Sequence, residues 1–263
     1  MAQIDPYVQL TESPGTGATT EQLSMLFTRY HTAVPYATGK RVLEVGCGPG
    51  MGLGYLAGIA DSIVGSDYSG TLLQNAYGHY KGRVPLVRLD AHALPFNSGI
   101  FDVVLIFEAL YYLAKPEVFF AEARRVLAPE GTLLICLANK DRPGFVRSPH
   151  THVYFSAGQL RDSLQAQGFM AEAFGAFPTA ETTIKGKFIA LARSLIVATN
   201  MIPGTLKGRE LLKRLAYGKL KQFPAEVTRE MPTAEALSPL IETATTRDFK
   251  VLYAIAHATE AAT

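Results

Sequence analysis

The feature that most constrains this chain is a glycine-rich stretch, RVLEVGCGPGMGLGYL, at residues 41–56. A strand-like run at 41–46 leads into a loop that holds Gly46, Gly48 and Gly50, and a helix-compatible run at 51–60 follows. Glycine leaves the backbone bare and free to take positive φ, so N–H groups and a helix start can approach a ligand closely. The stretch therefore predicts a strand–loop–helix unit whose loop binds a small molecule.

Strand-like and helix-like runs alternate along the rest of the chain. Further strands are expected at 62–67, 84–90, 101–110, 132–139, 168–177 and 248–258, and helices at 69–80, 116–127 and 156–169. The run at 101–110 is almost wholly apolar, which is typical of a parallel strand covered on both faces. This alternation predicts a doubly wound α/β sheet, in which ligands bind outside the carboxyl ends of the strands.

Composition narrows the possible classes of protein. The 263 residues are 48% hydrophobic, enough for one large domain or one domain with an insertion, and the net charge of +2 gives no general case for nucleic-acid binding. Two distant cysteines do not make a disulfide scaffold. We recognise no signal peptide, no apolar run of the ~20 residues that a membrane span needs, and no metal-ligating cluster. A soluble, cytoplasmic protein is expected.

Two classes of cofactor use a glycine loop of this kind. A dinucleotide site requires G-x-G-x-x-G/A in the turn itself, but the sixth position counted from Gly46 is Met51. A match at 52–57 begins inside the expected helix. The alternative fits better, because VLEVGCGPG resembles the first motif of the class I S-adenosylmethionine-dependent methyltransferases.

The resemblance continues in order through about residues 40–170. Asp67 ends the second strand, LDAHALPF follows the third, FDVVLIFEALYYL resembles the fourth-strand motif of the family, and EARRVLAPEGTLLI resembles the helix and fifth strand that come next. The resemblance implies a mostly parallel, seven-stranded sheet. It also implies S-adenosylmethionine as the cofactor and a methyltransferase activity in a biosynthetic pathway.

The resemblance also implies roles for particular residues. Asp67 would accept hydrogen bonds from both ribose hydroxyls, although an acid there also suits a nicotinamide cofactor. Asp90 discriminates between the two, since it would accept from the adenine amino group. The other residues expected at the cofactor are Glu44, Gly46, Cys47 and Gly48 at the methionine part, Ala91 at a purine nitrogen, Tyr68 and Leu94 on the purine faces, Tyr30 from a lid helix at 21–36, and Phe107.

Candidate bases follow the fourth strand, at Glu108, Tyr111 and Tyr112, and the fifth strand, at His150 and His152. His152 is our preferred general base, because it adjoins a strand-like VYF run and its imidazole titrates near neutrality. His150 and Tyr112 are the alternatives. The family often has Glu-His where this chain has Tyr111-Tyr112, which leaves a base at that position open.

The expected organisation has four parts: an N-terminal lid segment at 1–36, the cofactor-binding core at 37–177, an inserted helical cap at 178–246, and the last strand with a tail at 247–263. Between Glu181 and Phe223 the cap carries nine basic and two acidic residues. Such a charge suits an anionic or lipid-linked acceptor, or contact with a membrane surface. We expect O-methylation of a small-molecule, sugar or glycan hydroxyl. The alternatives are N- or C-methylation of a secondary metabolite, and a cofactor-binding regulatory protein without turnover.

Overall fold

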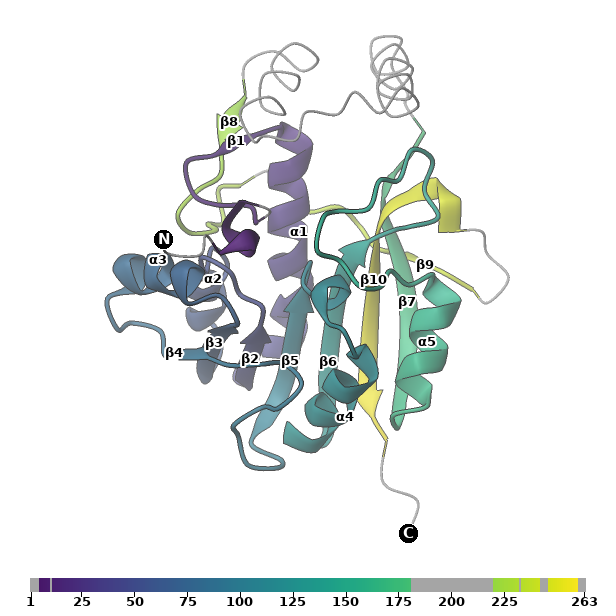
Figure 1. The fold of residues 1–263 in the computed structure, drawn as a ribbon, viewed down its shortest axis with the longest axis horizontal. Coiled ribbons are helices and arrows are strands. Elements are labelled where there is room, and N and C mark those ends of the chain that lie inside the picture. Colours follow the sequence, from purple (N-terminus) through teal and green to yellow (C-terminus); the bar gives the residue numbers. More distant parts are fainter. Residues whose placement is uncertain (1–4, 10, 181–219, 232, 242–245, 260–263) are drawn as a thin grey trace.

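The computed structural model describes residues 5–9, 11–180, 220–231, 233–241 and 246–259 (Figure 1). Its centre is an eight-stranded sheet in the order β4-β3-β2-β5-β6-β10-β7-β9. The strands are β2 Arg41–Val45, β3 Ser62–Asp67, β4 Leu86–Arg88, β5 Phe101–Phe107, β6 Leu127–Ala138, β7 Phe169–Pro178, β9 Ser238–Pro239 and β10 Phe249–Ala258. From β4 to β6 neighbouring strands are parallel, whereas β10 is antiparallel to both β6 and β7.

The seven expected strands are all present, and the two-residue β9 adds an eighth at the edge beside β7. The fourth strand ends at Phe107, three residues before the expected end. Glu108 takes φ 52, in the left-handed region, and a 3-10 turn, η2 Leu110–Tyr112, follows. A left-handed residue cannot continue a strand, so the chain turns away from the sheet there.

Helices cover both faces of the sheet. They are α1 Thr20–Ala37, α2 Leu53–Ala57, α3 Gly70–Tyr80, α4 Pro116–Val126 and α5 Ala157–Gln165. The first of them begins with a capping box, in which the Thr19 hydroxyl accepts from the Gln22 N–H and the Gln22 side chain accepts from the Thr19 N–H. A capping box of Ser156 and Gln159 likewise begins α5, at the start of the helix expected at 156–169. The helix expected at 51–60 is the five-residue α2, shorter than predicted.

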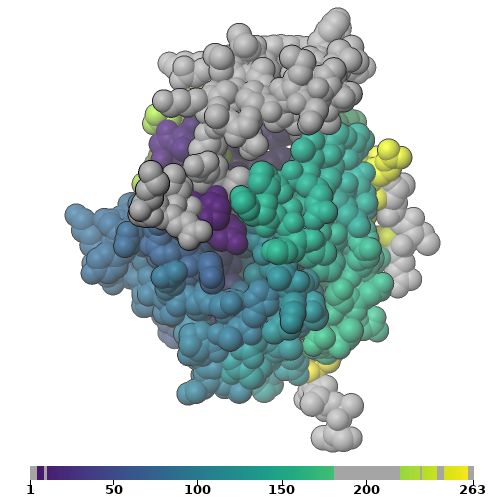
Figure 2. Space-filling view, in the orientation of Figure 1, coloured from purple at the N-terminus to yellow at the C-terminus, as the bar shows by residue number. Residues whose placement is uncertain are grey.

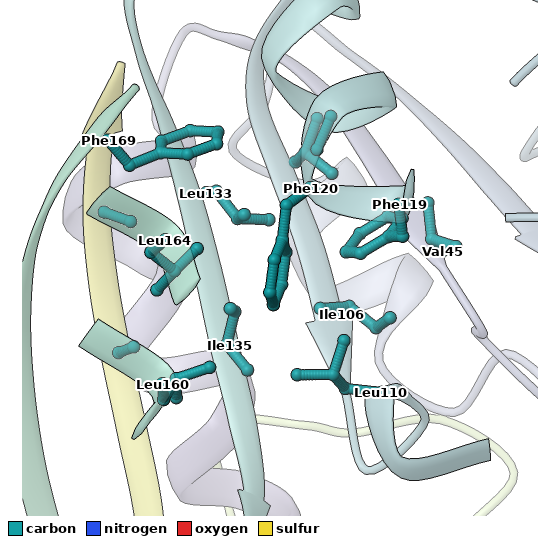
Figure 3. Close-up of a cluster of buried hydrophobic side chains, with 14 of the residues drawn as sticks. Val45, Ile106, Leu110, Phe119, Phe120, Leu133, Ile135, Leu160, Leu164 and Phe169 are labelled. Carbon is teal, nitrogen blue, oxygen red and sulfur yellow. The ribbon is translucent and has the colours of Figure 1, made fainter. Parts of the chain in front are cut away.

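Side chains alternate along the strands between two hydrophobic clusters. On one face Ile106 and Ile135 meet α4 and α5, and Phe120 lies among them (Figure 3). On the other face Leu105 and Leu134 pack with the apolar sides of α1, α2 and α3. Both faces of the central strands are buried, which explains why residues 101–107 are almost wholly apolar. The carboxyl ends of the parallel strands are then the part of the sheet where ligands bind in folds of this kind.

Only part of the expected cap falls within the described residues. Residues 181–219, 232 and 242–245, with all but one of the nine basic residues, lie outside them. The described remainder forms β8 Lys221–Gln222, which pairs with β1 Gly17–Ala18, and the edge strand β9. A 3-10 turn, η3 Thr246–Asp248, leads into β10. None of the helices in the described part of the chain has the length and apolarity of a membrane span.

Tyr80, at the end of α3, fixes the helix that follows the glycine loop. Its ring is fully buried, and its hydroxyl donates to the Gly50 carbonyl at 2.7 Å and accepts from the Gly54 N–H at 2.9 Å. A buried backbone group that loses its partner costs about 1–3 kcal/mol.

We therefore expect Tyr80→Phe to lower the free energy of unfolding by about 1–3 kcal/mol, because two backbone groups lose their partner. Urea denaturation measures this change. The matched control is Tyr77→Phe, since Tyr77 lies on the same helix with 64% of its surface exposed. Equal stabilities of the two variants would contradict this role of the Tyr80 hydroxyl.

Candidate active site

The glycine loop lies at the carboxyl end of β2 and is bare for a steric reason. Gly46, Gly48 and Gly50 all have positive φ, of 76°, 56° and 79°. A Cβ at Gly46 would lie 2.5 Å from the Cβ of Ala109, so no side chain fits there. The Gly46 N–H donates to the Ser66 carbonyl at 2.8 Å, which ties the loop to the end of β3.

Glu44 is a buried carboxyl at the end of β2. The Tyr30 hydroxyl donates to its Oε1 at 2.8 Å, while its Oε2 has no hydrogen-bond partner within the described residues. Burial raises the pKa of Glu44 to about 7, against the lowering effect of the Tyr30 hydrogen bond. An acceptor that is buried and unpaired calls for a ligand donor, and a cationic donor satisfies it best.

Tyr30 reaches Glu44 because Gly52 leaves room for its ring. A Cβ at Gly52 would lie 1.9 Å from the Tyr30 ring, and one at Gly54 would lie 1.8 Å from the Glu226 carboxylate. The sequence alone identifies these glycines only as residues of a helix. Their role is to admit side chains from distant segments, which a sequence alone does not reveal.

Asp67 stands at the end of β3, where it joins the glycine loop to the start of α3. Its Oδ2 accepts from the Gly48 N–H and its Oδ1 from the Ser69 N–H, each at 2.8 Å. Burial raises its pKa, and these two backbone hydrogen bonds act in the opposite direction. A carboxylate has about four acceptor positions, so two are left for a diol.

The residues expected around the purine occupy neighbouring loops. Asp90 follows β4 and is exposed, and its Oδ1 accepts from the His92 N–H at 2.9 Å, a hydrogen bond that lowers its pKa. Tyr68 is 60% exposed, whereas Ala91 and Leu94 are buried. The Tyr68 ring is thus open to a ligand, whereas Oδ1 of Asp90 also contacts the His92 ring at 2.6 Å, and Leu94 contributes from the core.

The remaining cofactor candidates, Cys47 and Phe107, are buried beneath the loop. Cys47 is buried, and that burial holds its pKa well above the usual range, so it is a thiol rather than a thiolate. The Phe107 ring is 5.6 Å from the Tyr30 ring, edge to face. His31, in contrast, lies on the exposed side of α1 with its ring stacked on Phe27.

The catalytic candidates are close in the fold but differ in exposure. The His152 N–H donates to the Tyr111 carbonyl at 2.8 Å, which brings this loop to η2. The side chains of His150 and His152 are exposed, and no hydrogen bond to a described residue orients either ring. Tyr112 is half-buried, and burial raises its pKa. The roles of His150, His152 and Tyr112 stay predictions.

An N-terminal turn that the sequence analysis did not single out lies against the site. The Tyr7 ring of η1 Pro6–Gln9 is 6.4 Å from Tyr68 and 5.5 Å from Tyr112, and the Ser69 hydroxyl donates to Asp5. In Figure 2 the dark purple atoms of this segment emerge between blue and teal parts of the surface. The turn therefore spans from the ribose-side candidates to η2.

These features fit S-adenosylmethionine better than a dinucleotide. The ligand carries an α-ammonium group and a sulfonium, and the buried Glu44 and the half-buried Asp67 place carboxyl groups at this edge of the sheet. The unpaired Oε2 of Glu44 provides an acceptor for the ammonium group. A pyrophosphate brings no cationic donor for this oxygen, and the turn lacks the G-x-G-x-x-G/A spacing that a dinucleotide needs.

Comparisons with known proteins agree with this geometry. Residues 43–135 match the family model described as a methyltransferase domain. A probable S-adenosylmethionine-dependent methyltransferase of Mycolicibacterium smegmatis is 29% identical over 153 residues, 54% of this chain and 57% of that protein. A fatty-acid O-methyltransferase of the same species is 39% identical over 114 residues, 40% of each chain. This chain thus spans about half the length of these relatives.

A solved structure supports the fold over a longer stretch. The structure titled as a putative methyltransferase of Bacillus halodurans aligns with a TM-score of 0.55 at 18% identity, and the alignment covers 91% of this chain and 99% of that one. Sheet order, glycine loop and family match together define a class of protein. Over residues 43–135 this chain therefore carries an S-adenosylmethionine-dependent methyltransferase domain, and its sheet has the class I fold.

Glu44 makes the stability of the unliganded protein depend on pH. Its carboxyl has an ordinary pKa of 4.5 and a folded pKa of about 7, so between these values the folded state binds a proton that the unfolded state has lost. Stability from this group is therefore present below pH 4.5 and is lost as pH rises through 7. We expect wild type to lose on the order of 2–3 kcal/mol more stability than Glu44→Gln between pH 5 and pH 8.

Denaturant unfolding of both proteins at a series of pH values measures this difference. Subtracting the two curves removes the shared contributions of Asp67 and Glu108, whose pKa values are also raised by burial. Parallel curves would show that Glu44 keeps an ordinary pKa in the folded protein.

Proposed function

We propose that this protein transfers a methyl group from S-adenosylmethionine to a hydroxyl group of a small-molecule or lipid-borne acceptor. The observation that carries the proposal is a continuous set of aromatic rings beside the carboxyl end of β5. The ring pairs Tyr7–Tyr112, Tyr112–Tyr111, Tyr111–Tyr154 and Tyr154–Phe145 have centroids 5.5, 4.7, 4.9 and 4.8 Å apart. Such a wall suits an apolar acceptor and excludes water, and its phenols can hydrogen-bond an acceptor hydroxyl.

The name of the fatty-acid O-methyltransferase supports a lipid acceptor and an oxygen as the methylated atom. A sugar or glycan hydroxyl stays an expectation, and so does contact of the basic 178–246 segment with an anionic headgroup. N- or C-methylation and cofactor binding without turnover are the alternatives.

The first expected outcome concerns the cofactor. S-Adenosylhomocysteine should bind and raise the melting temperature, because a ligand that binds only the folded state stabilises it. NAD should leave the melting temperature unchanged, because the turn lacks the G-x-G-x-x-G/A spacing that a pyrophosphate needs. Calorimetry with both ligands tests this. Tight binding of NAD without binding of S-adenosylhomocysteine would overturn the proposed function.

The expected contact between Asp67 and the ribose makes a more specific prediction, about the affinity for S-adenosylhomocysteine. Asp67→Asn removes a negative charge that would accept from two hydroxyls, and hydrogen bonds to a charged group are worth about 1.5–3 kcal/mol each. We expect the affinity for S-adenosylhomocysteine to fall about tenfold or more, since water replaces part of the loss. Asp61→Asn is the matched control, because Asp61 is exposed just before β3. A folded Asp67→Asn variant with full affinity would leave Asp67 only as a link between loop and helix.

Transfer of a labelled methyl group tests the acceptor class. We suggest long-chain alcohols, hydroxylated fatty acids, fatty acids and long-chain amines as a panel of matched chain length. Methyl ether or methyl ester products support oxygen as the acceptor atom. Transfer to the amines alone would favour N-methylation, and tight cofactor binding without any transfer would favour the non-catalytic alternative.

A further inference from the structure

Glu108, the residue directly after β5, has a backbone conformation that is unusual for a residue with a Cβ. Its φ of 52° is in the left-handed region, which a side chain with a Cβ occupies at a cost of order 1 kcal/mol or more. Its N–H still donates to the Cys136 carbonyl of β6 at 2.8 Å, so the strand pairing holds up to this residue. Unfavourable backbone geometry of this kind concentrates at functional sites.

The position of Glu108 relative to the glycine loop is fixed by close packing. Its neighbour Ala109 occupies the space that a side chain at Gly46 would need, with only 2.5 Å between the two Cβ positions. β5 also lies directly beside β2, in parallel register with Glu44 opposite Leu105. Glu108 is therefore the chain neighbour of the residue that packs against Gly46, in the loop that would hold the methionine part of the cofactor. It lies on the same side as the aromatic rings.

Two groups contact the carboxylate of Glu108, and two arginines lie near enough to affect its charge. The Tyr111 hydroxyl of η2 donates to Oε2 at 2.9 Å, and the Cys136 thiol of β6 lies 4.0 Å from Oε1. Arg29 of α1 is nearby, but its guanidinium pairs with Glu12 at 2.8 Å. Arg142, in the loop after β6, and Arg29 both lower the pKa of Glu108, whereas burial, the largest effect, raises it together with Glu12.

We propose that the Glu108 carboxylate faces the position of the transferred methyl group and is a catalytic residue of this site. This inference rests on the proposed function. The carboxylate would attract a cationic group at that position and would accept the proton of a hydroxyl acceptor. In that step the acceptor oxygen forms the new C–O bond, the C–S bond of the sulfonium breaks with its electron pair going to sulfur, and the hydroxyl proton moves to Glu108.

This assignment differs from the base that the sequence favoured. The His152 ring is exposed and no described residue orients it, whereas Glu108 is half-buried and its carboxylate accepts from the Tyr111 hydroxyl. A base must be in reach of the proton that it removes, so orientation favours Glu108. The loop with His152 then supports η2 through the Tyr111 carbonyl.

Two cofactor analogues test the position without any acceptor. Sinefungin carries a protonated amine where S-adenosylmethionine carries its methyl group, and S-adenosylhomocysteine has a neutral thioether with nothing in that place. We expect wild type to bind sinefungin about tenfold or more tightly than S-adenosylhomocysteine, because a charge-assisted contact is worth at least that factor. In Glu108→Gln the two affinities should come within about threefold of each other, with S-adenosylhomocysteine binding nearly unchanged.

Isothermal titration calorimetry of both ligands measures this preference. Glu117→Gln, on the exposed side of α4, is the matched control, and His152→Ala tests the rival base. Tyr111→Phe, which removes the hydroxyl that orients Glu108, should lose part of the preference and stands in if Glu108→Gln fails to fold.

A sinefungin preference that is absent in wild type, or that survives in folded Glu108→Gln, would overturn the proposal. So would a preference that depends on His152 instead. Failure of wild type to bind either analogue would instead overturn the proposed function, so the two failures are distinguishable.

Discussion

The rest of the structure depends on three carboxyl groups at one edge of the sheet, of which Glu44 is fully buried and Asp67 and Glu108 are half-buried. Glu44, Asp67 and Glu108 follow or end β2, β3 and β5, and burial is the largest cause of the raised pKa of each. Each receives hydrogen bonds from a different source: a tyrosine of α1, two backbone N–H groups, and a tyrosine of η2. These donors offset part of the cost of burial, and a ligand with two positive charges would offset more.

The rest of the fold holds this edge in place. Apolar side chains on both faces of the sheet supply the burial that keeps the strand ends rigid, and Tyr80 secures the chain after the glycine loop. The glycines in and after the loop have two roles. Gly46 and Gly48 keep the backbone bare beside Ala109 and Thr11, while Gly52 makes room for the Tyr30 ring that reaches Glu44. The site is therefore assembled by steric exclusion as much as by attraction.

The sequence predicted the sheet, the loop, Glu44 and Asp67 because each follows from local signals: an apolar run, a glycine spacing, an acid at a strand end. It did not single out Tyr7 as part of the site, since the contacts of that ring are with residues 61 and 105 positions away. It ranked His152 above Glu108 because imidazole titrates near neutral pH, but a sequence carries no information on which side chain is oriented. The left-handed φ of Glu108 had no local signal, because no glycine marks the turn there.

A crystal structure of the complex with S-adenosylhomocysteine tests the central claim most directly. The account predicts the amino group of the ligand on Oε2 of Glu44, the ribose hydroxyls on Asp67, and the sulfur between the Gly46 loop and the Glu108 carboxylate. A ligand bound away from the carboxyl ends of β2 and β3, or one whose amino group leaves Glu44 without a partner, would contradict it.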